Sequence, residues 1–169
     1  MQTVVGISGA TGAILGVRLV EKMLRQGVET HLIISKGGQK TISLEMGIKP
    51  EDVAKIASFS YLSENSEITK ELTDVNLMIV APCSMKTLSG IAWSRSDNLI
   101  FKVANMVLEK KGKLILLVRE SPWHMIHISN MLRVVEKGGI IMPPTVGASN
   151  IIEINDYIED ILDRVFKVI

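Results

Sequence analysis

The chain has 169 residues, of which 47% are apolar and 22% are charged. This length and composition exclude a disordered chain, predict one domain over residues 1–169 and favour a sheet buried on both faces. Because 19 Lys and Arg face 18 Asp and Glu, the net charge is only +1, and nothing indicates binding to nucleic acid. The start MQTVVGISG lacks signal-peptide features, and no apolar run reaches the roughly 20 residues of a membrane helix. We therefore expect a cytoplasmic protein without a membrane segment.

The first half of the chain predicts alternating strands and helices. Short apolar runs rich in β-branched residues predict strands over 3–7 and 29–34, each followed by a loop of small residues. The expected helices cover 14–24 and 39–46, with 35–38 as the loop before the second of them. Two further short helices are expected after Pro50 and around 66–72, in the least regular part of the chain.

The second half continues the same alternation. Strands are predicted over 77–81, 114–118 and 139–142, and helices over 87–92, 97–110, 124–136 and 155–168. The runs LMIVA and LILLV do not alternate with polar residues, which is typical of strands with helices on both faces. The sequence therefore predicts an α/β fold with a three-layer, doubly wound parallel sheet, flavodoxin-like or Rossmann-like.

Polar residues follow four of the predicted strands, where an open α/β sheet binds its ligands. Residues 6–12 (GISGATG) offer hydroxyls and bare amides at a helix start, which suits a phosphate, although tight strand-to-helix packing also explains them. Residues 82–87 (PCSMKT) again place Ser and Thr before a helix. Ser35-Lys36 either adds a hydroxyl and a cation to the ligand site or only caps the following helix. Arg119-Glu120, directly after a strand, either contacts the ligand or forms an ion pair at the surface.

Other residues favour structural roles. Cys83 has no convincing histidine partner, so we expect a buried thiol rather than a nucleophile. His124 and His127 have a spacing that could bind a metal, but no second pair of ligands matches them, and we expect no metal site. Trp93 and Trp123 fit the core or a subunit interface better than the wall of a ligand site, and with the apolar excess they predict a homo-oligomer larger than a dimer.

Seven motifs together resemble one family. GISGATGAILGVRL, HLIISK, SLE, APCSMKTLSGIA, DNLI, LLVRESPWH and GGIIMPP occur, over about residues 3–144, in the order and spacing of the UbiX-type flavin prenyltransferases. The resemblance implies FMN bound between the subunits of a homododecamer, without metal. It also implies transfer of a dimethylallyl group from dimethylallyl phosphate to N5 and C6 of reduced FMN, which makes the prenylated FMN that UbiD-type decarboxylases need.

The resemblance also assigns site residues. Ser8, Glu45 and Glu120 match residues near the reactive edge of the flavin, where carboxylates relay protons. Lys102 and Arg164 match ligands of the donor phosphate. The implied FMN contacts are Gly9, Ala10, Thr11, Ser35, Ser84, Met85, Lys86, Thr87 and Arg119.

The chain departs from this family where the donor phosphate is held. The family usually has Arg in place of Lys102, Lys in place of Glu109 and Tyr in place of Ser149. An alternative function is therefore an FMN-binding or flavin-carrying protein that has lost prenyl transfer. A related cysteine-decarboxylating enzyme is less favoured, because such enzymes have an early catalytic His and a PASANT-like loop where this chain has APCSMKT.

Overall fold

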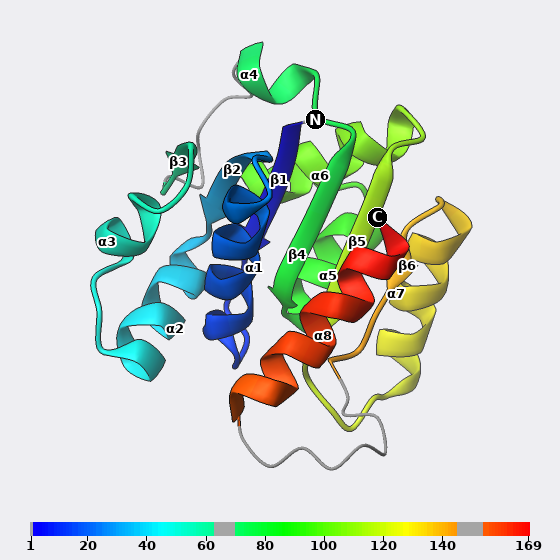
Figure 1. The fold of residues 1–169 in the computed structure, drawn as a ribbon. Helices are drawn as coiled ribbons and strands as arrows, with labels where there is room; N and C mark the ends of the chain where they lie inside the picture. The colour runs from blue at the N-terminus through cyan, green and yellow to red at the C-terminus, as the bar shows by residue number, and fades with distance from the viewer. Residues whose placement is uncertain (1, 63–69, 145–153) are drawn as a thin grey trace.

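The computed structural model describes residues 2–62, 70–144 and 154–169 and is built around one parallel sheet (Figure 1). Its six strands have the order β3-β2-β1-β4-β5-β6, which is the Rossmann order. The predicted doubly wound α/β fold is thus confirmed. The strands are β1 (Gln2–Ile7), β2 (Glu29–Ile34), β3 (Phe59–Tyr61), β4 (Leu77–Cys83), β5 (Lys113–Val118) and β6 (Ile140–Ile141).

Eight helices in the described ranges cover the two faces of the sheet. They are α1 (Ala13–Arg25), α2 (Lys36–Met46), α3 (Pro50–Ala54), α4 (Lys70–Thr73), α5 (Met85–Ala92), α6 (Leu99–Glu109), α7 (Met125–Glu136) and α8 (Ile154–Val168). In Figure 1, α1 and α8 lie in front of the sheet, and α6 lies behind it. Within the described ranges, no helix is both long enough and apolar enough to cross a membrane.

The inner strands supply two separate cores. Val4 and Val80 belong to the core shared with α5, α6 and α7, whereas Val5 and Ile79 belong to the core shared with α1 and α8. All four side chains are fully buried. Because successive strand residues point to opposite faces and both faces are covered, most positions of these strands are apolar, and even the polar Thr3, Thr30 and His31 are buried. The alternation of apolar and polar residues expected for a sheet with one solvated face is absent.

The topology creates a crevice between β1 and β4. β1 pairs with β2 on one side, from Gln2↔Glu29 to Ile7↔Ile34, and with β4 on the other, starting at Thr3↔Leu77. The strand order reverses at this point, so the loops after β1 and β4 leave the sheet side by side. Ligands of open α/β sheets bind in such a crevice, outside the carboxyl ends of the strands.

One local prediction was wrong, and one strand was not predicted. Residues 35–38 were predicted as a loop, but α2 begins at Lys36, because Ser35 caps it by accepting the N–H of Gly38 at 3.1 Å. A Cβ on Gly38 would lie 2.3 Å from the carbonyl oxygen of Ile7, so glycine at this position reflects close packing against β1 rather than a loop. The sequence also gave no sign of β3, whose three residues pair with β2 at the edge of the sheet.

Candidate functional site

Two cavities open at the carboxyl edge of the sheet. The first, called the polar cavity, has a volume of about 200 Å³ and is lined by Gly9, Ser35, Gly37, Ser84, Lys86, Thr87, Asn98, Phe101 and Glu120. The second, called the large cavity, has a volume of about 560 Å³ and is lined by Thr11, Gly12, Ile14, Leu15, Glu45, Met46, Arg119, Tyr157 and Ile158. The loop after β1 contributes to both, so the cavities lie on either side of residues 9–12.

Ser8 joins the loops that follow β1 and β4. It is 1% exposed, and its hydroxyl donates to the carbonyl of Pro82 at 2.8 Å while accepting the N–H of Ser84 at 2.8 Å. Both the proton and an acceptor position of this hydroxyl are therefore occupied within the protein. In this arrangement Ser8 acts as a positioning residue that sets where the start of α5 lies.

The first loop also approaches α2 closely. A Cβ built on Gly9 would lie 2.9 Å from the Cα of Gly37. Two glycines facing each other therefore let the backbone of the loop and the start of α2 meet, and both line the polar cavity. Bare backbone of this kind allows a ligand to approach peptide N–H groups directly.

The N-terminus of α5 carries the polar groups of the polar cavity. Ser84 caps the helix by accepting the N–H of Thr87 at 3.2 Å, and its hydroxyl donates to the Thr87 hydroxyl at 3.0 Å. The carboxylate of Glu120 accepts the N–H of Met85 at 2.6 Å. Lys86 lines the same cavity. The result is a helix N-terminus with hydroxyls and an ammonium group, which is the chemistry that binds phosphate.

The N-terminus of α1 is capped from another helix. Gly12 has a φ of 101° and no side chain, so α1 has no cap of its own. Both carboxylate oxygens of Glu45, near the end of α2, accept the Gly12 N–H at 3.0 and 3.2 Å, and one also accepts the Ala13 N–H at 3.0 Å. Glu45 and Glu120 thus each bind a helix N-terminus, where negative charge is favoured. One lies at each cavity.

Arg119 and Glu120 are adjacent in sequence but separate in space. Arg119 lines the large cavity and Glu120 the polar cavity. No salt bridge joins them, although both are described, so the surface ion pair that was one interpretation of this dipeptide is wrong. Instead, the two residues that follow β5 place one charged side chain at each cavity.

Sequence reasoning missed Tyr157 and Asn98. Tyr157 lies in the first turn of α8, lines the large cavity and donates its phenolic proton to the carbonyl of Pro144 at 2.7 Å. Asn98 caps α6 by accepting the N–H of Phe101 at 2.9 Å, and it lines the polar cavity. An Asn before an apolar run is a readable cap signal. Nothing in the sequence pattern of α8 marks Tyr157.

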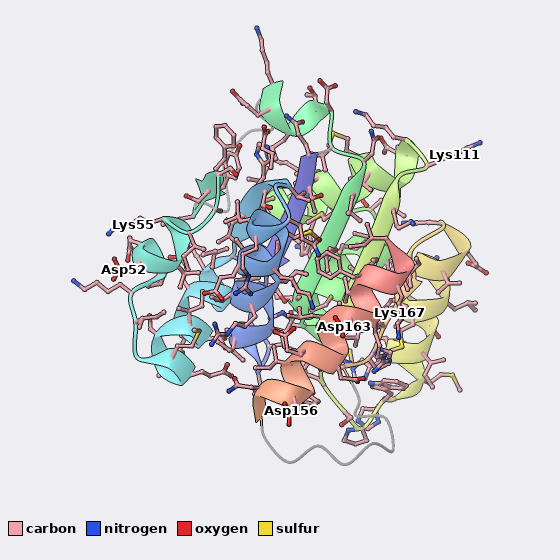
Figure 2. All side chains as sticks on the ribbon, viewed as in Figure 1. Asp52, Lys55, Lys111, Asp156, Asp163 and Lys167 are labelled. Atoms are coloured by element: carbon pink, nitrogen blue, oxygen red, sulfur yellow. The ribbon has the colours of Figure 1, made fainter. Side chains whose placement is uncertain are left out.

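α8 packs on the core beside α1 through a buried apolar face, and exposed ion pairs between the two helices are added to this packing. Lys22 of α1 bonds Glu159 at 3.0 Å and Asp163 at 2.7 Å. Figure 2 labels Asp163 along α8 and Asp156 at its lower end, which is the end at the carboxyl edge of the sheet. These contacts hold the first turn of α8, with Tyr157, over the large cavity.

Four positions connected with the donor phosphate, two assigned ligands and two departures from the family, lie away from both cavities or outside the described ranges. Lys102 of α6 and Arg164 of α8 line neither cavity. Glu109 ends α6 and lines a separate cavity of about 270 Å³ with Ser94 and Lys137. An eleven-residue helix rises about 1.5 Å per residue, so Glu109 is far from the start of α6 at the polar cavity. Ser149 lies outside the described residues.

The cysteine and the histidine pair have structural roles. Cys83 is fully buried, and this burial, together with the nearby charge of Glu120, raises the pKa of its thiol, so it is protonated and unreactive. The Nδ1 of His127 accepts the N–H of His124 at 3.2 Å, which closes the first turn of α7. Both histidines therefore belong to a helix start.

An apolar surface covers α7. Trp93 and Trp123 are 59% and 42% exposed, so the expectation that they might be core residues is wrong. Trp93 donates its Nε1–H to Asn130 of α7 at 3.1 Å, and the guanidinium of Arg133 lies 4.0 Å from its ring centroid. The exposed apolar residues of α7 are Met125, Ile126, Ile128, Leu132 and Val135. Such a contiguous apolar surface is typical of a protein interface.

Known proteins share this sequence and fold. A sequence profile of the flavoprotein family matches residues 1–167. A UbiX-like flavin prenyltransferase from Bacillus subtilis (strain 168) is 42% identical over 146 residues, covering 85% of this chain and 72% of that protein. AnUbiX (PadA1), solved in complex with FMN and dimethylallyl pyrophosphate, aligns with a TM-score of 0.93 and 34% identity, covering 99% of this chain and 90% of that one.

A second solved structure has the same fold. It is a dodecameric FMN-dependent UbiX-like decarboxylase from Escherichia coli O157:H7, which aligns with a TM-score of 0.93 and 36% identity, covering 99% of this chain and 93% of that one. The identity and coverage of these relatives, together with the family profile, agree with the motifs of the sequence. The chain therefore belongs to the flavoprotein family and, within it, to the UbiX-type flavin prenyltransferases.

Proposed function

We propose that this protein binds FMN at the carboxyl edge of its sheet and, once the FMN is reduced, transfers to it a dimethylallyl group from dimethylallyl phosphate. The observation that carries the proposal is the pair of adjoining cavities, one polar at a helix N-terminus and one largely apolar with a guanidinium group. In this reaction the allylic C–O bond of the donor breaks and phosphate leaves. The N5–H and C6–H bonds of the reduced flavin are replaced by bonds to the two ends of the allyl unit; one of the two protons leaves with the phosphate, and the other is taken up by the central allyl carbon.

The residues of the polar cavity fit the phosphate of FMN. The N-terminus of α5, the hydroxyls of Ser35, Ser84 and Thr87, and the ammonium of Lys86 line one small space. Cβ atoms at Gly9 and Gly37 would close the backbone approach there. From this anchor the flavin would extend past Ala10 and Thr11 to the large cavity, where Arg119 would complete its site.

The large cavity fits the donor. Ile14, Leu15 and Met46 supply apolar walls for a dimethylallyl chain, and Arg119 supplies a cation for its phosphate. Stabilising the leaving anion while excluding water favours formation of an allylic cation. Glu45 and Glu120 are placed to hold or move protons as the flavin changes its bonding, and Ser8 positions Ser84. Lys102 and Arg164 are the further cations assigned to the donor phosphate.

The proposal includes assembly of the chain, as one FMN-binding domain over residues 1–169, into a homo-oligomer above the dimer. The exposed apolar surface of α7 with Trp93 and Trp123 supports an interface between copies, and the dodecameric relative supports twelve. A cytoplasmic location suits a chain whose single cysteine is a free thiol. A UbiD-type decarboxylase would receive the product.

A second candidate function is FMN binding or delivery without prenyl transfer. The reversed charge at Glu109 and the serine at position 149 favour it, because both alter the family's donor-phosphate site. One experiment separates the two functions. Purified protein is loaded with FMN, reduced, incubated with dimethylallyl phosphate, and the extracted flavin is weighed by mass spectrometry. The proposed function predicts a flavin heavier by one dimethylallyl group less one hydrogen, whereas unmodified FMN bound at micromolar affinity identifies a carrier. Protein that binds no FMN contradicts both.

A further inference from the structure

Tyr157 packs its ring partly against the core beneath α8, and its phenolic oxygen is the polar end of a side chain that also lines the large cavity. The neighbouring helix residues Ile158, Ile161 and Leu162 are almost fully buried in the core beneath α8, whereas Tyr157 is only partly buried and borders the cavity. The chain has two tyrosines, and the other, Tyr61, lies on β3 at the edge of the sheet.

Few groups in the large cavity are suited to an anion. The N–H of Gly12 is taken by Glu45, whose carboxylate repels a phosphate. Among the described residues, no salt bridge occupies the guanidinium of Arg119, which lines this cavity. Besides Arg119, the side-chain donors that the described part of the chain brings to this cavity are the hydroxyls of Thr11 and Tyr157. An anionic group that pairs with Arg119 therefore finds its hydrogen-bond donors in this small set.

The phenol is positioned but can be redirected. Its proton is donated to the carbonyl of Pro144, three residues after the end of β6, at 2.7 Å. A phenolic O–H rotates about its C–O bond, so the same proton can be given to a phosphoryl oxygen instead. The Lys22 bonds to Glu159 and Asp163 keep the helix that carries Tyr157 in place.

From these contacts we infer that Tyr157 is a substrate-binding residue that donates a hydrogen bond to the phosphate of the allylic donor, beside Arg119. The inference rests on the proposed function and deepens it. It assigns the phosphate end of the donor to the side of the large cavity formed by β5 and α8, and it assigns the dimethylallyl chain to the apolar wall formed by Ile14, Leu15 and Met46.

The test compares two variants that each remove one phenolic oxygen. Tyr157→Phe removes the proposed donor. Tyr61→Phe removes a phenol on β3 that lies 3.3 Å from Nδ1 of His31 on β2. Calorimetry of the oxidised FMN-loaded proteins measures binding of dimethylallyl phosphate and of dimethylallyl alcohol, which has the same chain without the phosphate. Thermal unfolding and FMN affinity report on structure.

We expect Tyr157→Phe to weaken binding of dimethylallyl phosphate by about tenfold or more, as for loss of a hydrogen bond to a charged group. Binding of the alcohol, FMN affinity and the unfolding temperature should match those of Tyr61→Phe. Unchanged phosphate binding in Tyr157→Phe would overturn the inference. Equal losses for phosphate and alcohol would also overturn it, because they indicate that the phenol only supports the cavity wall through Pro144.

Failure of the proposed function gives a different result. If the wild type binds dimethylallyl phosphate with the Tyr157 dependence expected but leaves reduced FMN unmodified, prenyl transfer is contradicted and the assignment of Tyr157 stands. If prenyl transfer proceeds and Tyr157→Phe has the wild-type KM for the donor, only the assignment of Tyr157 is overturned. A wild type that binds neither ligand overturns both.

Discussion

The polar cavity and the large cavity meet at the same loop but are built in different ways. The polar cavity takes nearly all its residues from the loops and first helical turns that directly follow β1, β2, β4 and β5. The large cavity combines the start of α1, the end of α2, Arg119 after β5 and the first turn of α8, which is more than 140 residues from residue 11. One cavity is therefore a property of the parallel sheet, and the other depends on how the terminal helix packs.

Loss of the ammonium group in the polar cavity should have the largest effect. Lys86→Ala is expected to weaken FMN binding by up to about a hundredfold, because a charge-assisted bond to phosphate is lost. Donor binding to protein saturated with FMN should be unchanged, since Lys86 does not line the large cavity. Fluorescence titration of FMN measures the first effect and calorimetry the second. Lys40→Ala, an exposed lysine of α2, is the matched control. Equal FMN affinity in the two variants would contradict this division between the cavities.

The contact that joins the loops after β1 and β4 should come next. Ser8→Ala leaves the buried N–H of Ser84 and the carbonyl of Pro82 without this partner, so we expect a loss of about 2 kcal/mol in the free energy of unfolding. FMN binding should weaken too, because Ser84 caps the helix of the polar cavity. Urea unfolding tests this, with the exposed Ser43→Ala as control. A stability equal to that of the control would show that the hydroxyl does not fix the loops.

The cations outside both cavities should have smaller effects, confined to the donor. Neither Lys102 nor Arg164 lines the large cavity of its own chain, so contact with the donor phosphate would come from a neighbouring copy in the oligomer. On that basis Lys102→Ala and Arg164→Ala are each expected to reduce use of dimethylallyl phosphate by up to about tenfold, and Glu109→Lys should improve it by the same route. FMN affinity should stay near that of the wild type in all three. Steady-state kinetics of prenyl transfer with varied donor gives the measurement. If these substitutions have no effect in a protein that transfers prenyl groups, the donor is bound by the groups of the large cavity alone.

The smallest change is expected at the cap of α1. Glu45→Ala removes the acceptor for the Gly12 and Ala13 N–H groups and should cost about 1 kcal/mol of stability, with a smaller loss in Glu45→Gln. The glutamine variant sharpens the role of this residue. If Glu45 transfers protons, Glu45→Gln lowers kcat with little change in melting temperature. If it is only a cap, kcat and melting temperature fall together and more steeply in Glu45→Ala.

The two cavities also differ in how well their residues could be predicted from the sequence. β1, β2, β4 and β5 were predictable because buried parallel strands give continuous apolar runs, and loops rich in glycine and hydroxyls mark the strand ends. The residues of the polar cavity follow from that pattern, since parallel strands deliver their following loops to one edge. The cap of α2 at Ser35 was available as an alternative interpretation, and the structure shows it to be correct.

The large cavity could not be predicted in the same way. Tyr157 occupies an ordinary position in an amphipathic helix, and only the packing of the apolar face of α8 on the core beside α1 brings it to the cavity that Arg119 also lines. The cap that Glu45 provides for α1 links residues 33 apart, which no local capping signal reveals. Likewise, nothing in the sequence around Trp93 indicates whether its side chain is buried or exposed, and the structure shows that it is exposed.

A crystal structure of this protein with oxidised FMN and dimethylallyl phosphate would test the division between the two cavities most directly, because the donor is not consumed unless the flavin is reduced. We predict that the flavin phosphate lies against Ser84, Lys86 and Thr87 at the start of α5. The donor phosphate should lie beside Arg119 in the large cavity, with its chain against Ile14 and Met46. A flavin phosphate bound in the large cavity, or a donor bound away from Arg119, would contradict this account.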